Sequence, residues 1–420
     1  MGFRGSSVFW DMQSAMAEAA KPTPLDPQST DPSVERPRDV AAGERKRRRS
    51  RLALFVLAVL AILLARPASH HVRATQLLLA FSDANAKPDV TEELVEIAVP
   101  RTPTTEARKV KARIFSPPGA TTATPAVVLV HGVQRLGIEE PRLQRFARSI
   151  VSAGIVVMTP QVDELADYAV SARSIETVGA AIETLRTQRG ARRVGLMGVS
   201  FGGGIALLTA ADARFADQVG FVVAVGAHDD LARVSGFFAT DEIEDASGTT
   251  RKLHAHEYGA TVLVYSHAED FFPADDVPAA RTALRFWLWE KRDEAREAAK
   301  GLSPESKAKV EKLFAADIAS VRPELLAEIE RRKADMKTVS PHEHLAGIRA
   351  NVYLLHGEGD TVIPATETVW LAKDVPASSL RAVLVSPAIQ HVELKEPTLG
   401  DKWALVHFMS QIITEAEASR

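Results

Sequence analysis

The sequence predicts an α/β fold in which a mostly parallel central sheet carries helices on both faces, and two features of the pattern indicate this. First, short apolar runs recur from about residue 126, and such runs are typical of strands buried on both faces of a parallel sheet. Second, amphipathic segments of helix length, such as 140–153 and 170–186, lie between most of the runs. The expected strands are 126–130, 155–158, 194–197, 219–225, 262–265, 352–355 and 381–385.

Two earlier segments, 94–99 and 109–115, alternate apolar and polar residues. Alternation of this kind is typical of half-buried antiparallel strands. We therefore expect the folded domain to begin at about residue 93 and to continue to residue 420.

A charged, helix-rich stretch interrupts the regular pattern, and we interpret residues 270–345 as a helical cap insertion. Ser303-Pro304 matches a helix start with Pro at the first helical position, and Ser340 with Glu343 matches a capping box. The alternative is that these are ordinary solvated helices beside the sheet, with no role over a site.

Composition excludes several classes of function. The chain of 420 residues has a formal net charge of −3, so it offers no general attraction to nucleic acid. It contains no cysteine, which excludes disulfides, thiolate nucleophiles and thiolate metal sites.

The N-terminal region differs in composition from the rest of the chain. Residues 1–44 are rich in Pro and lack apolar periodicity, which predicts a disordered tail. A basic flank and an apolar run at 52–65 follow, and we interpret 45–66 as a single-pass membrane anchor and 67–92 as a linker. The excess of basic residues before the run predicts a cytoplasmic N-terminus and an extracytoplasmic domain. The alternative is a cleaved signal peptide and a secreted or periplasmic protein.

The strongest motif is Gly198-Val199-Ser200-Phe201-Gly202, which lies between an expected strand and an expected helix. A serine on such a tight turn has strained backbone geometry, so the residues two before and two after it must be small. Gly198 and Gly202 meet this requirement, and Ser200 lies where the following amide can face a developing oxyanion. The context predicts that Ser200 is a nucleophile.

With this motif in place, the stretch from about 95 to 408 resembles the α/β-hydrolase family, in particular its dienelactone-hydrolase-like and prolyl-oligopeptidase-like esterases. The resemblance implies that His131-Gly132-Val133 follows a strand that precedes a crossover helix, and that the amides of Val133 and Phe201 form the oxyanion hole. His131 itself is expected to be structural.

A serine nucleophile needs a base and a group that orients the base, and the family order is Ser, acid, His. Asp360 follows a buried strand in a Gly-containing loop, and His391 follows the next strand, so Asp360 and His391 are the expected partners of Ser200. Asp270 is a rival acid and His356 a rival histidine. His254 and His256 suggest a metal pair, but two histidines without a third ligand are weak, so we expect no metal site.

These residues predict a serine hydrolase that cleaves a small-molecule acyl or ester substrate through an acyl-enzyme, without a cofactor. An acyltransferase or peptidase with the same triad is an alternative, as is a catalytically silent, membrane-tethered interaction protein. Ser at the turn excludes relatives that use an aspartate nucleophile. Five aromatic residues could line an apolar pocket or form ordinary core, namely Phe271, Phe272, Phe286, Trp287 and Trp289. The pattern leaves the oligomeric state open.

Overall fold

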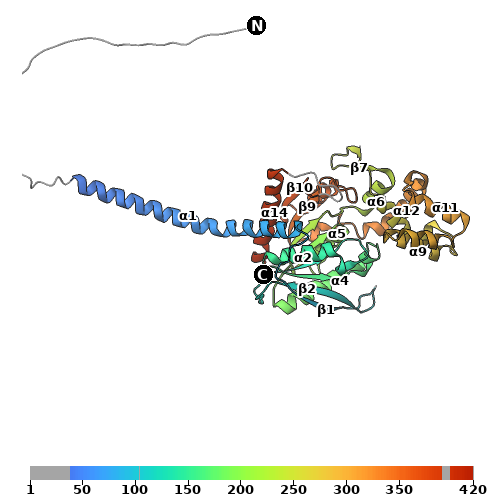
Figure 1. Ribbon diagram of the computed structural model, residues 1–420, viewed down its shortest axis with the longest axis horizontal. Coiled ribbons are helices and arrows are strands. Elements are labelled where there is room, and N and C mark those ends of the chain that lie inside the picture. Colours follow the sequence, from blue (N-terminus) through green and yellow to red (C-terminus); the bar gives the residue numbers. More distant parts are fainter. Residues whose placement is uncertain (1–37, 104, 390–397, 420) are drawn as a thin grey trace, which may run out of the picture. The chain divides into compact units, whose positions relative to one another are not determined.

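The computed structural model describes residues 38–103, 105–389 and 398–419 (Figure 1). The chain divides into two compact units, residues 1–62 and 63–420. Helix α1 (Arg38–Ser82) begins in the first unit and ends in the second, and all other described elements belong to the second unit.

The second unit is built on an eight-stranded sheet with the order β1-β2-β4-β3-β5-β6-β9-β10. Strand β1 is antiparallel to β2 and β2 is antiparallel to β4, whereas every other neighbouring pair is parallel. The predicted mostly parallel sheet is therefore confirmed. The strands are β1 (Thr91–Val99), β2 (Arg108–Ser116), β3 (Ala126–Val130), β4 (Val156–Pro160), β5 (Val194–Val199), β6 (Val219–Val225), β9 (Asn351–Gly357) and β10 (Leu380–Ser386).

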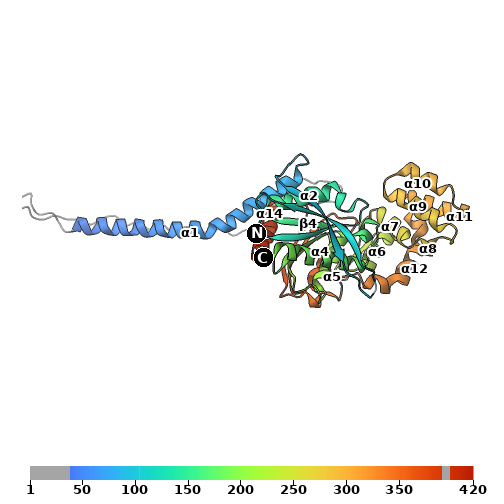
Figure 2. The same cartoon turned by 90° about the horizontal axis from the view of Figure 1, so that it is seen from below.

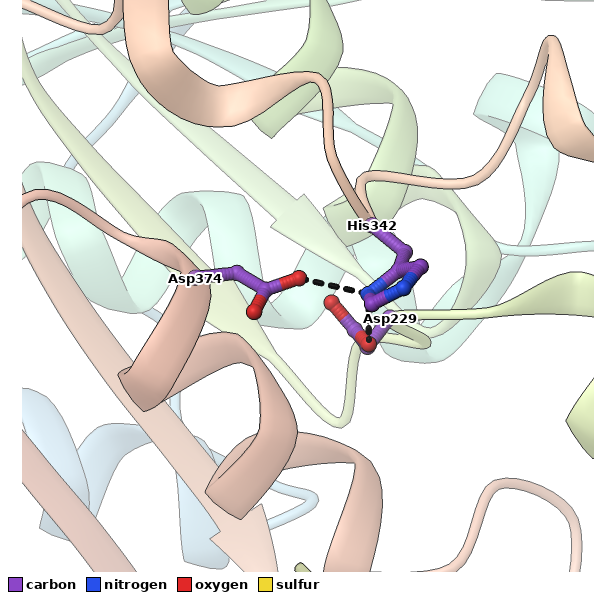
Figure 3. Close-up of side chains that lie close together, drawn as sticks. All are labelled: Asp229, His342 and Asp374. Atoms are coloured by element: carbon purple, nitrogen blue, oxygen red, sulfur yellow. Dashed lines mark hydrogen bonds and ion pairs between the residues drawn. The ribbon is translucent and has the colours of Figure 1, made fainter.

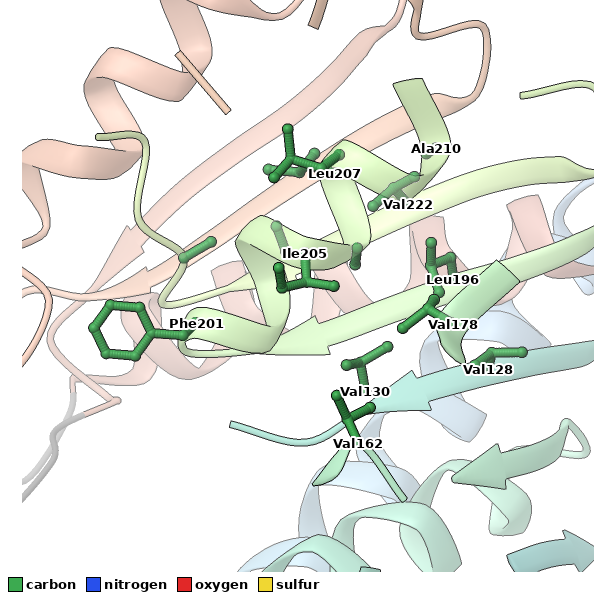
Figure 4. Close-up of a cluster of buried hydrophobic side chains, with 14 of the residues drawn as sticks. Val128, Val130, Val162, Val178, Leu196, Phe201, Ile205, Leu207, Ala210 and Val222 are labelled. Atoms are coloured by element: carbon green, nitrogen blue, oxygen red, sulfur yellow. The ribbon is translucent and has the colours of Figure 1, made fainter. Parts of the chain in front are cut away.

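Helices cover both faces of this sheet, because its central strands are apolar on both sides. One face packs against α4 (Arg173–Arg189), α5 (Phe201–Ala211) and α13 (Thr366–Asp374). Figure 4 shows part of this core, where Ile205 and Leu207 of α5 lie close to valines and leucines of the strands. The other face packs against α2 (Pro141–Ser152), α14 (Leu399–Ala418) and the last turns of α1. Two short helices, η1 (Gly137–Glu139) and α3 (Asp163–Ala166), lie in the connections.

Residues 226–350 leave the sheet after β6 and return to it at β9, and we call this stretch the excursion. Most of its helices gather beside one end of the sheet (Figure 2) and share a separate apolar core. The predicted helical insertion at 270–345 is thus part of a longer one that starts nearer to β6. The elements are α6 (Leu231–Thr240), β7 (Glu242–Glu244), β8 (Thr250–Lys252), α7 (Tyr258–Ser266), α8 (Ala268–Phe271), α9 (Val277–Leu288), α10 (Arg292–Ala299), α11 (Pro304–Phe314), α12 (Ile318–Lys337) and η2 (Leu345–Gly347).

Two local predictions within the excursion were wrong. The apolar run 262–265 is not a strand but part of helix α7, most of which is buried among other helices. Ser340 starts no helix of its own, because its hydroxyl donates to the carbonyl of Met336 and accepts from the N–H of Leu231, the first residue of α6. The predicted helix start at Ser303 is confirmed, since its side chain accepts from the Ser306 N–H.

Helix α1 differs from the expected N-terminal organisation. It includes residues 38–44 of the expected tail, and it runs through 67–82, where we expected a linker. In the second unit its later turns pack against α14, where Arg73 and His70 both contact the Glu417 carboxylate. A search of the described residues finds no helix long and apolar enough to cross a membrane, so the anchor expected at 52–65 is not supported.

Candidate active site

Ser200 lies at the turn between strand β5 and helix α5, as the motif predicted. Its backbone has φ 56° and ψ −135°, a strained region for a residue with a side chain. The turn is held in place because the Ser200 N–H donates to the carbonyl of Val225 at 2.8 Å and the Ser200 carbonyl accepts from Gly203 at 2.8 Å. This is the geometry in which a serine side chain projects from a sharp strand–helix turn.

The two glycines of the motif are required by close backbone contacts. A Cβ atom on Gly198 would overlap the carbonyl of Gly202, and a Cβ atom on Gly202 would overlap the carbonyl of His131. No rotation of a side chain could relieve either overlap, since the obstructing atoms belong to the backbone. The turn therefore tolerates only glycine at both positions.

The loop after strand β3 lies against Ser200. A Cβ atom on Gly132 would lie 3.0 Å from the Cβ atom of Ser200 and 3.6 Å from its Oγ. The next residue, Val133, and the first residue of α5, Phe201, both border the cavity described below. The N–H of Phe201 is one of the first-turn donors that no intrahelical carbonyl can accept. The two residues expected to form an oxyanion hole are thus a chain neighbour of Ser200 and a chain neighbour of Gly132, which lies against Ser200.

His131 is structural, as expected. Its Nδ1–H donates to the carbonyl of Gly132 at 2.8 Å, and its Nε2 accepts from the Val162 N–H at 3.1 Å. Burial lowers the pKa of His131, although the hydrogen bond to Gly132 and the nearby Asp163 act in the opposite direction. A neutral imidazole therefore joins the ends of β3 and β4 and positions the loop beside Ser200.

Asp360 lies in the loop after β9, and its carboxylate is buried. Its Oδ1 accepts from the N–H groups of Val362 at 2.8 Å and Ile363 at 3.0 Å, which fixes the side chain in one orientation. A Cβ atom on Gly226 would lie 3.6 Å from its Oδ2, so this oxygen faces the end of β6. Strand β6 lies between β5 and β9, and all three are parallel. Ser200 and Asp360 therefore both lie at the carboxyl end of the sheet.

His391 lies outside the described residues, but the chain leading to it does not. A Cβ atom on Gly357 would overlap the carbonyl of Ile389, and the Ile389 N–H donates to Ser386 at 3.4 Å. The chain two residues before His391 is therefore held against the end of β9, from which the Asp360 loop also starts.

A cavity of about 370 Å³ is bordered by Val133 and by Phe201, the residue that follows Ser200, but Ser200 is not among the residues that line it. Its wall combines Val133 and Phe201 with residues of α6, α7 and the end of α12, so the excursion forms most of the cavity. The wall is mainly apolar, and it includes two tyrosines that sequence reasoning missed, Tyr168 and Tyr258. The hydroxyl of Tyr258 donates to the carbonyl of Val133 at 3.3 Å, which connects the excursion directly to the loop beside Ser200.

The rival residues have other roles. Asp270 forms ion pairs with Arg331, at 3.1 Å, and with Arg332. His356 lies in strand β9, where its Nε2–H donates to the Ile363 carbonyl at 2.8 Å and its Nδ1 lies 2.6 Å from the Thr368 hydroxyl. Its Nε2 also lies 3.7 Å from Oδ2 of Asp360.

Neither the histidine pair nor the aromatic residues form the sites considered for them. His254 is 92% exposed and pairs with Asp241, and neither His254 nor His256 belongs to a metal-compatible group among the described residues. None of the five aromatic residues borders the cavity beside Ser200. Phe271 and Phe272 are buried in the core of the excursion, and Trp287 stacks on Phe314.

Comparison with known proteins shows similarity of structure only. No family model matches the chain, and no curated protein matches its sequence. A putative hydrolase from Legionella pneumophila has a similar structure, with a TM-score of 0.50 at 12% identity over 81% of this chain and 94% of that one.

Two further solved structures are more distant. Brefeldin A esterase, a bacterial homologue of human hormone-sensitive lipase, has a TM-score of 0.46 at 15% identity over 85% of this chain and 87% of its own. The acylaminoacyl peptidase of Pyrococcus horikoshii has a TM-score of 0.42 at 11% identity over 77% of this chain. The present chain covers only 40% of that peptidase. The strand order, the turn at Ser200 and the Legionella structure together show that this chain has the α/β-hydrolase fold.

Proposed function

We propose that the protein is a serine hydrolase that cleaves ester-like bonds, with Ser200 as its nucleophile. The observation that carries this proposal is the strained backbone of Ser200 at a glycine-flanked turn, and the next residue, Phe201, borders a largely apolar cavity. A fold keeps such strain where a side chain must be presented to a ligand.

In the proposed reaction, the Oγ atom of Ser200 attacks the carbonyl carbon of the substrate while His391 accepts the hydroxyl proton. Asp360 orients His391 and stabilises the imidazolium that forms. Two backbone N–H groups fix Oδ1 of Asp360, and Oδ2 lies 3.7 Å from Nε2 of His356. His391 then protonates the leaving alcohol, and water repeats the sequence to release the acid.

The amides of Val133 and Phe201 are proposed to donate hydrogen bonds to the oxyanion of the tetrahedral intermediate. Donors of this kind commonly contribute about 3–4 kcal/mol each to transition-state stabilisation. The support is positional, because Gly132 lies against Ser200 and Phe201 begins the helix that follows it. No cofactor takes part in these steps.

The test is the reaction of the full chain with a fluorophosphonate probe, followed by intact mass measurement. The Oγ atom of an activated Ser200 displaces fluoride from phosphorus, and the proton passes to the base. We expect one adduct on the wild type and none on Ser200→Ala. Ser235→Ala is the matched control, because Ser235 borders the same cavity and should leave the adduct unchanged.

An adduct that persists in Ser200→Ala, or a folded wild type that never reacts, would overturn the proposal. The second result would favour the silent interaction protein. Esters, thioesters and amides with one common acyl group then separate esterase from peptidase activity, and an added alcohol acceptor reveals acyl transfer.

A further inference from the structure

Three side chains meet where the two ends of the excursion approach α13 (Figure 3): Asp229 in the loop after β6, His342 in the segment after α12, and Asp374 at the end of α13. The His342 Nδ1 lies 2.7 Å from Oδ2 of Asp374 and 3.5 Å from Oδ2 of Asp229. One ligand atom from each residue lies within 4.8 Å of the other two. This group plays no part in the proposed hydrolysis.

One oxygen of this group is buried without a partner. The Asp229 side chain is 0% exposed. Its Oδ2 is 2.9 Å from a guanidinium nitrogen of Arg233, but its Oδ1 has no hydrogen-bond partner among the described residues. In Figure 3, the Asp229 oxygen without a dashed line is turned toward Asp374. A buried carboxylate oxygen that faces a second carboxylate is costly unless a cation or a proton lies between them.

The charges around the group are also unbalanced. Glu367 lies beside it and accepts from Arg233 at 2.6 Å and from the backbone N–H of Asp229 at 2.8 Å. Asp229 and Glu367 contact the one guanidinium, and Asp374 contacts His342, so the set has a formal charge of −3 + 1 = −2 when His342 is neutral. Burial raises the pKa of Asp229, and Glu367 adds to this effect while Arg233 opposes it. A divalent cation would neutralise the set.

We infer that Asp229, His342 and Asp374 form a binding site for a divalent transition metal of the zinc type. The ligands are Oδ1 of Asp229, Nδ1 of His342 and a carboxylate oxygen of Asp374. An imidazole with two carboxylates suits zinc better than calcium or magnesium, which prefer all-oxygen sites. Tetrahedral zinc places its ligand atoms about 3.4 Å apart, so small side-chain rotations suffice.

Access and proton balance are compatible with binding from solution. The His342 and Asp374 side chains are 36% and 21% exposed, so the metal can enter from their side and keep water as a further ligand. The metal takes the place of the Nδ1 proton that His342 otherwise shares with Asp374. The neutral imidazole then carries its single proton on Nε2, so metal binding needs a change of tautomer and releases no proton from His342.

The position of the site suggests what the metal does. The backbone N–H of His342 donates to the backbone carbonyl of Asp229 at 3.0 Å, so the end of the excursion already contacts the loop after β6. Just before His342, the residues Met336, Thr338 and Val339 border the cavity beside Ser200. A metal at this point fastens that cavity wall to the sheet. We therefore assign it a structural role.

A second group, His267 with Asp270 and Glu328, does not share these properties. Asp270 and Glu328 both pair with Arg331 and Arg332, so two guanidinium groups already neutralise the carboxylates. We assign no metal to this group.

The test titrates Zn²⁺ into the chelator-treated full chain by calorimetry, beside thermal unfolding with and without the metal. We expect one site per chain and a rise in Tm of about 2 °C or more at saturating metal. His342→Gln and Asp374→Asn should each weaken binding at least tenfold and remove the rise in Tm. Circular dichroism establishes that both variants fold.

The matched control is His344→Gln, because His344 is exposed and bonds the carbonyl of Lys337 outside the group. It should bind Zn²⁺ as the wild type does. No binding by the folded wild type, or equal binding by all three variants, overturns the inference. Binding of Ca²⁺ or Mg²⁺ in preference to Zn²⁺ would contradict the assignment of a zinc-type metal to the site. Fluorophosphonate labelling of Ser200 is scored separately, so failure of either proposal is distinguishable from failure of the other.

Discussion

The sheet and the excursion divide the candidate site between them, and they are built in different ways. The sheet supplies Ser200 and Asp360 from strand ends whose positions are fixed by parallel hydrogen bonding and close glycine contacts. The excursion supplies most of the cavity wall through helices joined by polar contacts, such as that from Tyr258 to Val133. Changes in the sheet should therefore abolish the chemistry, whereas changes in the excursion should redirect it.

The largest effect is expected for Gly202→Val. Its Cβ atom would overlap the backbone carbonyl of His131, so either the turn at Ser200 or the loop after β3 must move. We expect loss of the fluorophosphonate adduct and a large fall in Tm by circular dichroism. Gly236→Ala in α6 is the counterpart in the excursion, because a Cβ atom there meets nothing within 4 Å. That change should be neutral or stabilise the protein by up to about 1 kcal/mol. A well-folded, reactive Gly202→Val variant would contradict the expectation that the turn at Ser200 tolerates change less than the excursion does.

The next largest effect is expected for Asp360→Asn, which removes the charge but keeps the size of the side chain. If Asp360 orients His391, kcat for an ester should fall by roughly 10²–10⁴ while the Tm changes little. Steady-state kinetics beside a melting curve measures both. Glu358→Gln is the control, because this carboxylate is exposed in the same loop. Equal activity in the Asn variant and the wild type would reopen the assignment of the acid.

A change in the excursion should alter specificity more than rate. Val262→Trp adds bulk to the cavity wall on α7, so kcat/KM for long-chain esters should fall about tenfold relative to acetate esters. Competition between p-nitrophenyl esters of graded length measures the ratio. Val369→Trp, on the exposed side of α13, should leave the ratio of kcat/KM for long-chain and acetate esters unchanged. An equal loss of kcat/KM for every chain length would indicate that the acyl chain does not bind in this cavity.

The smallest effect is expected for Glu417→Gln, far from the cavity. Burial of the Glu417 carboxyl raises its pKa, but hydrogen bonds from Arg73, Arg66 and His70 outweigh this and lower the pKa to about 2. The ionised group therefore stabilises the fold above its unfolded pKa of about 4.5, and this contribution is lost as the pH falls toward 2. Urea unfolding at pH 7 should show a loss of about 1 kcal/mol in the variant. The difference between variant and wild type should shrink below pH 4.5, and a difference that grows there would contradict the assignment.

The sequence allowed prediction of the sheet because its signals are local. A buried parallel strand is a continuous apolar run, and the turn at Ser200 requires glycines at fixed spacing. Local signals failed in the excursion for a physical reason. Helix α7 is apolar on nearly all sides because other helices surround it, so residues 262–265 show neither helical nor strand periodicity.

Contacts between distant elements could not be predicted at all. Asp229, His342 and Asp374 come from three elements, and only the return of the excursion to the sheet brings them together. Tyr258 similarly reaches Val133 across a separation of 125 residues. Such pairs leave no periodic trace in a single sequence.

The place where the excursion leaves the sheet has a consequence for how such a protein can change. Strands β6 and β9 are parallel neighbours, so the chain must cross from the carboxyl end of one to the amino end of the other whatever lies between them. One crossover helix would satisfy that need. The segment between them is thus an interchangeable module, and a shorter or different one would leave the nucleophile turn and the acid loop on their strands. Under the proposed function, a change of this segment would therefore alter the cavity wall and leave Ser200 and Asp360 in place.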